Sequence, residues 1–243
     1  MKMLLIAGHG QGDPGACANG YKEADLVREI LLKLKNKLSD YASVDVFDIN
    51  KNMYKFLKAG NTFNFKNYDY VFEVHFNAAA NDTKGDGRTT GTEILVHPSE
   101  KGTTVERAIV RNISALGFKS RGVKTRSDLQ NMNVCKKRQG VSYALLETCF
   151  IDDKDDMKLY VAKKDAVITA IANGIISGFN LGAVSTGEKA EPIKELTTPN
   201  DIVWELSQRI EISDVTKAVK DLTKAMDENS SCYWMLKKIA NKR

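Results

Sequence analysis

Cysteines, prolines and long apolar runs are all scarce in this chain of 243 residues. Its four cysteines form no Cys-x-x-Cys pair and are too few for a disulfide framework, which suits a reducing compartment. The first apolar run, MLLIA, is broken by Gly8 and is too short for a signal-peptide core or a membrane span. We therefore expect a soluble protein that is made in the cytoplasm without a signal peptide and has no membrane partner.

Patterns for nucleic-acid or phosphate binding are also lacking. The net charge of +5 is by itself a weak indication of an anionic partner. The chain has no helix-turn-helix, RRM or zinc-finger pattern, so we expect no nucleic-acid partner. The stretch GHGQGDPG, residues 8–15, is rich in glycine but has neither a GK[ST] ending nor a complete GxGxxG, which disfavours a phosphate loop.

The composition changes towards the C-terminus. Residues 1–182 carry the whole net charge and are long enough for one domain with its own core. Residues 183–197 combine Gly, Ser, Thr, Pro and charged residues without an apolar period, which predicts a linker. Residues 185–243 are electrically neutral, and within them residues 198–243 predict a small all-α module of three short helices.

Within the first domain, apolar patterns alternate between strand and helix. The predicted strands are 1–7, 43–49, 68–76, 92–97 and 142–148, and the predicted helices are 21–38, 103–117 and 163–179. This alternation predicts an α/β fold, with a mostly parallel, twisted sheet and helices on both faces. In such sheets, ligand sites gather at the carboxyl ends of the strands.

Histidine is scarce as well, and two of the three histidines follow this rule. His9 stands just beyond the first predicted strand, among the glycines of AGHGQGDPGA, and His75 ends the third strand. Two glutamates accompany them. Glu23 falls on the apolar face of the first helix, where a buried carboxylate needs a positive partner, and Glu147 ends the apolar run of the last strand.

These four side chains predict a metal-dependent hydrolase. Two imidazoles and one carboxylate form the ligand set of a catalytic zinc ion whose fourth position is left to water. The metal lowers the pKa of that water to about 7, and a second carboxylate outside the ligand set can then act as general acid and base. We expect His9, Glu23 and His75 to bind Zn²⁺ and Glu147 to be catalytic.

The stretches AGHGQGDPGA, EVHFNA and ALLETCFIDD, together with Glu23, resemble the zinc-dependent N-acetylmuramoyl-L-alanine amidases of the amidase-3 type, including phage endolysins, over residues 1–181. In that family the His of GHG, a Glu at the start of the next helix and the His of HxNA bind zinc, and the Glu of the LLET-like motif is catalytic. The resemblance implies these roles for His9, Glu23, His75 and Glu147. It also implies hydrolysis of the amide between N-acetylmuramic acid and L-alanine in peptidoglycan, leading to lysis of a bacterial host.

The chain departs from that family at two places. Ile6-Ala7 stands where Asp-Pro usually precedes GHG, and Glu73 stands where many relatives have a small residue. Glu73 shares a strand face with His75, so we expect it to orient that imidazole from outside the ligand set. Asn77 of the HFNA motif is a candidate substrate-binding residue.

Alternatives remain open at this point. A zinc peptidase that cuts within the stem peptide would use the same ligands, and an inactive amidase fold would serve only as a wall-binding protein. Cys149 could pair with His75 in a Cys-His amidase, although a buried structural thiol is the simpler interpretation. The sequence does not distinguish zinc from another divalent metal.

The C-terminal stretches DIVWEL and YW resemble those of lysins from clostridial phages. This resemblance implies that the module at 198–243 binds the cell wall, and the candidate residues are Trp204, Tyr233 and Trp234. A module of this size is near the lower limit of independent stability, so self-association through it is plausible. An endolysin of this kind is made in the cytoplasm of the bacterial host and reaches the wall after the membrane is permeabilised.

Overall fold

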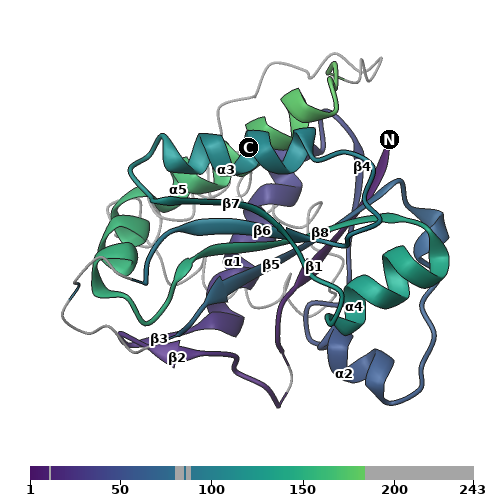
Figure 1. Ribbon diagram of the computed structural model, residues 1–243, viewed down its shortest axis with the longest axis horizontal. Coiled ribbons are helices and arrows are strands. Elements are labelled where there is room, and N and C mark those ends of the chain that lie inside the picture. Colours follow the sequence, from purple (N-terminus) through teal and green to yellow (C-terminus); the bar gives the residue numbers. More distant parts are fainter. Residues whose placement is uncertain (11, 80–84, 86–88, 184–243) are drawn as a thin grey trace, which may run out of the picture. The chain divides into compact units, whose positions relative to one another are not determined.

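The computed structural model of the protein describes residues 1–10, 12–79, 85 and 89–183 (Figure 1). The predicted module at 198–243, with Trp204, Tyr233 and Trp234, lies outside the described residues. All but the first residue of the predicted linker at 183–197 lie outside them as well.

A six-stranded sheet with the order β4-β1-β5-β8-β6-β7 forms the centre of the first domain. Its strands are β1 (Lys2–Ala7), β4 (Ser43–Val46), β5 (Tyr70–Asn77), β6 (Thr92–Val96), β7 (Ser120–Thr125) and β8 (Ser142–Phe150). Four neighbouring pairs are parallel and the β6–β8 pair is antiparallel, so the predicted mostly parallel sheet is confirmed. Because β6 runs against β8, the first residues of β6 lie at the edge where β1, β5 and β8 end.

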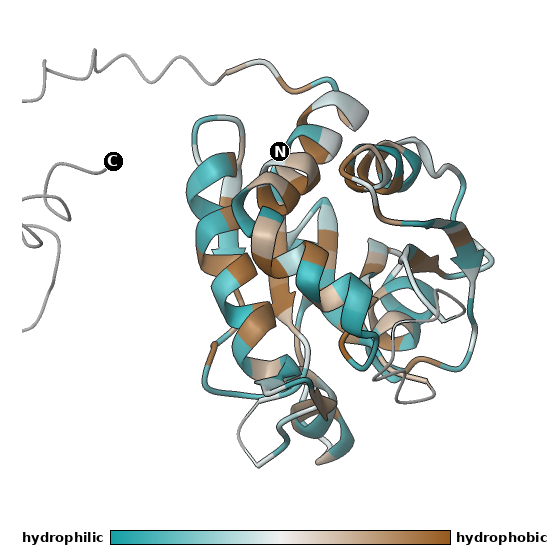
Figure 2. Cartoon of the chain, turned by 90° about the vertical axis from the view of Figure 1, so that its left-hand side faces the viewer, coloured by the Kyte–Doolittle hydropathy of each residue, from teal (hydrophilic) through white to brown (hydrophobic). Residues whose placement is uncertain are grey.

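Helices cover both faces of the sheet, as predicted (Figure 1). One face packs against α1 (Glu23–Leu38), α3 (Thr104–Ser114) and α5 (Lys154–Gly178). The other packs against the shorter elements α2 (Met53–Lys58), η1 (Phe65–Asn67), α4 (Gln130–Met132) and the π-helical turn η2 (Asn133–Arg138). These helices carry both hydrophobic and hydrophilic segments, which is typical of elements with one buried side (Figure 2).

Strict alternation along the strands produces two separate cores. In β1, Met3 and Leu5 pack under α1, whereas Leu4 and Ile6 pack on the opposite face. All four are at most 1% exposed, so β1 has the continuous apolar pattern of a strand buried on both sides.

Several elements differ from the sequence prediction. The helix predicted at 163–179 begins earlier, at Lys154, and has non-helical backbone angles at Lys163, where the predicted helix starts. The strand β7 and the short helix α2 were not predicted. β7 is an edge strand whose residues are exposed or half-buried, so it lacks the apolar alternation that identifies a strand. The short strands β2 (Cys17–Ala18) and β3 (Tyr21–Lys22), which were not predicted either, form a small hairpin ahead of α1.

Among the described residues, no helix is long and apolar enough to cross a membrane.

Candidate metal centre

His9 lies in the loop that follows β1 and has an unusual backbone conformation. Its φ angle is 62°, in the left-handed region that residues other than glycine rarely adopt. Two backbone hydrogen bonds between Gly10 and Asp13 close the loop. The Asp13 carboxylate accepts a hydrogen bond from Nδ1 of His9 at 3.1 Å and another from Asn52 Nδ2 at 2.9 Å. The loop therefore holds the imidazole ring of His9 so that its Nε2 atom faces Glu23.

Glu23 is the first residue of α1, and its side chain is almost completely buried, as predicted. One carboxylate oxygen lies 2.9 Å from Nδ1 of His75, and the other lies 3.1 Å from Nε2 of His9. Backbone N–H groups of Ala16 and Phe76 donate to the same two oxygens. Burial alone would raise the pKa of Glu23, but the hydrogen bonds from the two imidazoles outweigh it and hold the pKa well below its ordinary value.

His75 stands near the end of β5 with both ring nitrogens engaged. Nδ1 faces Glu23, and Nε2 lies 2.9 Å from Glu73 Oε1. The buried Glu73 carboxylate also accepts hydrogen bonds from Asn131 Nδ2 and from the Tyr143 hydroxyl. Burial lowers the pKa of His75, but Glu23 and Glu73 together raise it well above its ordinary value.

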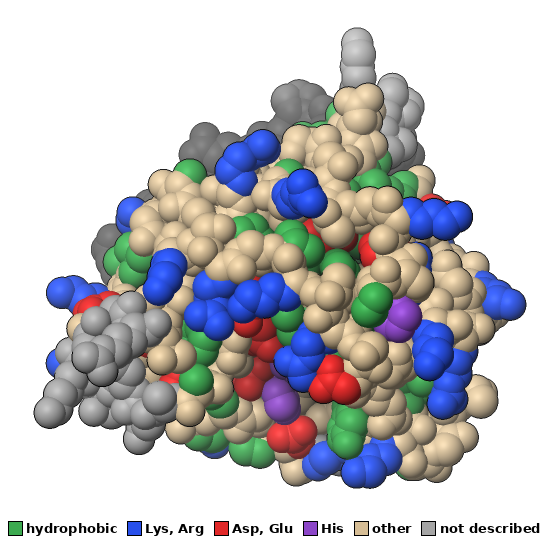
Figure 3. Space-filling model, in the orientation of Figure 1, with side chains coloured by type: hydrophobic (Ala, Val, Ile, Leu, Met, Phe, Trp, Pro, Cys, Tyr) green, Lys and Arg blue, Asp and Glu red, His purple; other side chains and the backbone are tan. Residues whose placement is uncertain are grey.

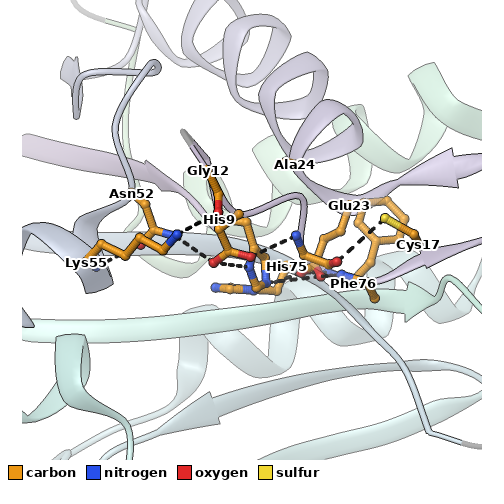
Figure 4. Close-up of polar contacts among 12 residues, drawn as sticks. His9, Gly12, Cys17, Glu23, Ala24, Asn52, Lys55, His75 and Phe76 are labelled. Carbon is orange, nitrogen blue, oxygen red and sulfur yellow. Dashed lines mark hydrogen bonds and ion pairs between the residues drawn. The ribbon is translucent and has the colours of Figure 1, made fainter.

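Three predicted ligands thus converge on one point. One donor atom from each of His9, Glu23 and His75 lies within 4.8 Å of the other two, and the described residues contain no other group of three such side chains. Figure 4 shows the three side chains pointing toward one another. Because Asp13 engages Nδ1 of His9 and Glu73 engages Nε2 of His75, one nitrogen of each imidazole is left to face the centre. Two imidazole nitrogens and a carboxylate oxygen fit the donor set of a catalytic zinc ion.

Glu147 lies beside this cluster without being part of it. It stands on β8 directly opposite His75 in the parallel β5–β8 pair, so the side chains of Glu147 and His75 lie on the same face of the sheet. Its Oε2 atom is buried and has no hydrogen-bond partner among the described residues. Burial raises the pKa of Glu147 from 4.5 to about 7. The site therefore holds a carboxyl group that can both accept and donate a proton near neutral pH.

A cavity of about 270 Å³ opens beside the two imidazoles, lined by residues of β5, β8, α2 and α4. A second cavity of about 720 Å³ shares Gln130 with it and extends between α2 and η2. In the space-filling view, acidic side chains lie at the bottom of a hollow next to a histidine, and lysine and arginine side chains stand on its rim (Figure 3).

Two other candidate residues lie at or near this edge. Asn77 donates a hydrogen bond from Nδ2 to Glu93 Oε1 at 3.0 Å. This contact involves none of the three converging side chains. Cys149 belongs to the core on the α1 side of the sheet, and its thiol is completely buried. Since His75 faces the other side, the structure does not bring Cys149 and His75 together.

Sequence reasoning did not identify the partners that orient the imidazoles, apart from Glu73. Asp13 stands four residues after His9 in the same loop, and this local spacing was a usable signal. Asn131 and Tyr143 are 58 and 70 residues away from Glu73, and each lies in a stretch that reads as ordinary polar or apolar sequence. No local pattern could have identified them.

Comparison with known proteins finds relatives over most of the chain. The chain is 32% identical over 182 residues to the endolysin of Bacillus phage SPP1, covering 72% of this chain and 63% of the phage protein. It is 28% identical over 214 residues to the probable autolysin PH of Staphylococcus aureus, covering 82% of this chain and 43% of the autolysin. The chain thus spans less than two thirds of the length of either relative.

The fold is shared with solved amidase structures. One is the N-acetylmuramoyl-L-alanine amidase from Clostridium difficile 630, with a TM-score of 0.57 and 21% identity over 74% of this chain and 94% of that one. Residues 3–177 match the family Amidase_3, described as N-acetylmuramoyl-L-alanine amidase. This match takes in most of the chain and every residue of the candidate metal centre, and the chain therefore belongs to the amidase-3 family of N-acetylmuramoyl-L-alanine amidases.

Proposed function

We propose that the protein is a zinc-dependent hydrolase of bacterial peptidoglycan that cleaves the amide between N-acetylmuramic acid and L-alanine. The observation that carries this proposal is the convergence of donor atoms from His9, Glu23 and His75 within 4.8 Å, beside the buried carboxyl group of Glu147. Membership of the amidase-3 family supports the choice of bond.

The roles of the side chains follow from their hydrogen bonds. Nε2 of His9, Nδ1 of His75 and a carboxylate oxygen of Glu23 would hold the metal. Asp13 and Glu73 keep the two imidazoles in the tautomers that point these nitrogens inward. Bound zinc supplies a water of lowered pKa and polarises the scissile carbonyl.

Glu147 moves the proton. Its carboxylate accepts a proton from the attacking water, and the resulting carboxylic acid donates it to the amide nitrogen as the C–N bond breaks. The products are the lactyl carboxylate of N-acetylmuramic acid and a stem peptide with a free L-alanine amine. A pKa of about 7 suits both steps, because the two protonation states of Glu147 are then close in free energy at neutral pH.

We also propose a lytic role, in which the enzyme is held in the host cytoplasm until the membrane is permeabilised. The similarity to a phage endolysin supports this proposal. The wall-binding role of residues 198–243, self-association through them and a clostridial-phage origin stay predictions. Residues 1–184 alone are expected to pellet with cell walls less than the whole chain does while still cleaving soluble muropeptides; equal pelleting would contradict the wall-binding assignment.

The deciding experiment is mass spectrometry of purified Gram-positive peptidoglycan after digestion with the protein. The proposal predicts free stem peptides that begin with L-alanine, lost on chelation and restored by zinc. Shorter peptides with intact links to muramic acid would identify a peptidase instead. No products under any metal condition would indicate a wall-binding protein with an inactive amidase fold.

A further inference from the structure

Two basic side chains, Arg121 and Lys124, contact Glu93, which is the neighbour of Glu147 in the sheet. Nε of Arg121 lies 2.9 Å from Glu93 Oε2, and Nζ of Lys124 contacts the same oxygen. We call Arg121 and Lys124 the basic pair. Glu93 is 5% exposed and stands directly opposite Glu147 in the antiparallel β6–β8 pair. Asn77 contacts its other carboxylate oxygen. The mechanism proposed above uses none of these charges.

An irregularity in β7 is what brings the basic pair together. Its members are three residues apart, so in a regular strand they would point to opposite faces of the sheet. Between the paired positions Thr92–Ser120 and Ile94–Val123, β6 advances two residues and β7 advances three. Gly122 stands within this extra length with a φ angle of 78°, which favours glycine. Such bulges redirect side chains, and this one turns both cations toward Glu93.

The basic pair has more charge than its partner can balance. Among the described residues, the two cations pair with one carboxylate, that of Glu93, whose side chain is 7% exposed. The side chains of Arg121 and Lys124 remain 26% and 45% exposed, so both still reach solvent. The Arg121 guanidinium also lies over the ring of Phe150 at 4.9 Å, which fixes its plane. A fixed guanidinium next to an ammonium group is a suitable receptor for a carboxylate.

The order of the strands indicates which part of the substrate would meet this receptor. Across the sheet the order is β1, β5, β8, β6 and β7. His9 follows β1, His75 lies on β5 and Glu147 lies on β8. Glu93 lies on β6, and the basic pair lies on β7. A scissile carbonyl between the imidazoles, with its nitrogen at Glu147, directs the sugar toward β1 and the leaving peptide toward β7. In the stem peptide, the residue after L-alanine is a glutamate joined through its side chain, so its α-carboxylate is free.

We propose that Arg121 and Lys124 bind this free α-carboxylate and so make the enzyme select stem peptides whose second residue is not amidated. This inference rests on the proposed amidase function. Glu93 acts as a positioning residue, because it holds the two cations in place and touches no substrate.

The test uses two soluble muropeptides that are identical except at the second stem residue, which carries either the free α-carboxylate or the corresponding carboxamide. We compare kcat and KM for the whole chain, for Lys124→Gln, for the charge-conserving Lys124→Arg and for Lys137→Gln, an exposed lysine on η2. Wild type should prefer the carboxylate substrate. Lys124→Gln should lower kcat/KM for that substrate about tenfold, mainly through KM, and change the carboxamide reaction by less than about twofold. Lys124→Arg should restore the preference, and Lys137→Gln should behave as wild type.

Each other outcome overturns the inference in a distinguishable way. If wild type cleaves both substrates equally well and Lys124→Gln changes neither rate, the basic pair does not bind the carboxylate, and the amidase function stands. An equal loss of kcat/KM on both substrates would mean that Lys124 does not recognise the α-carboxylate. It would then act in another way, for example by contacting another anionic component of the wall. If wild type cleaves neither substrate, the proposed amidase function itself fails.

Discussion

Oδ2 of Asp13 lies 3.1 Å from Nδ1 of His9, and Nε2 of the same ring lies 3.1 Å from Glu23. The carboxylate thus occupies the nitrogen that faces away from the centre. An imidazole whose outer nitrogen is held by a carboxylate keeps one tautomer and one ring orientation, and becomes a more basic ligand. Asp13 is therefore as much a part of the proposed metal site as the residues whose atoms converge in it.

Replacing Asp13 by asparagine should weaken zinc binding by about tenfold to a hundredfold, because the ring loses its anionic partner but the loop keeps a side chain of the same size. Competition titration against a chelator measures this change. Asp48→Asn, at an exposed aspartate that pairs with Lys51, is the matched control and should bind zinc as wild type does. Similar affinities for the two variants would remove Asp13 from the site.

Gly15→Ala should abolish zinc binding and activity. A Cβ atom at Gly15 would come within 2.6 Å of Glu23 Oε2 and 2.7 Å of His9 Cδ2, which displaces two of the three proposed ligands. Gly20→Ala controls for backbone strain, because Gly20 also has a positive φ angle but has nothing within 4 Å of the added atom. Metal content after dialysis separates the two variants. Full zinc content in Gly15→Ala would contradict the assigned site.

Zinc affinity should fall steeply as the pH falls. In the metal-free protein the acidic partners raise the pKa values of His9 and His75 above 6.5 despite burial, so both rings hold their protons to a higher pH than free imidazole does. Zinc must displace those protons, and binding therefore weakens as soon as the pH drops below the raised values. Between pH 8 and pH 6 we expect a loss of more than about tenfold in affinity, measured by chelator competition. An affinity independent of pH in this range would exclude imidazole ligands.

Glu147→Gln should retain zinc and lose about a hundredfold to ten-thousandfold in kcat, because the amide can neither accept the proton of water nor donate one to the leaving nitrogen. Zinc content and muropeptide cleavage are measured on the same preparation. Glu29→Gln, at a glutamate that pairs with Lys33 and Lys164, should leave both unchanged. Activity of Glu147→Gln near the wild-type level would assign the proton transfer to another group.

The same carboxyl group should make the metal-free protein less stable as the pH rises. The folded-state pKa of Glu147, about 7, lies above its ordinary value of 4.5, so the folded protein binds more protons than the unfolded chain between these values. Stability is then lost as the pH rises through this window, by about 3 kcal/mol in all. Urea unfolding at pH 5 and pH 8 should show that Glu147→Gln gains stability relative to wild type at the higher pH. A constant difference between the two proteins would contradict the raised pKa.

Much of the fold could be predicted because its signals are local. The apolar run of β1 and the alternation of β5 identify strands that are buried by neighbouring layers, and the stripe of α1 identifies a helix with one buried side. The edge strand β7 escaped prediction because its residues are mostly exposed or half-buried. The same strand carries the irregularity that brings Arg121 and Lys124 together. The proposed carboxylate site could therefore not be predicted from the apolar pattern of the sequence.

Local sequence patterns were enough to identify the chemical groups that stand at the strand ends. Periodicity places Glu23 on a buried helix face and His75 and Glu147 at strand ends, because side-chain direction within one element depends only on its local repeat. The orientation of the His75 ring depends on tertiary packing, because Asn131 and Tyr143, from distant segments, hold the Glu73 carboxylate that contacts its Nε2 atom. The tertiary structure also decided that Glu93 stands opposite Glu147, because β6 runs antiparallel to β8 and register between strands is set by packing of the whole sheet.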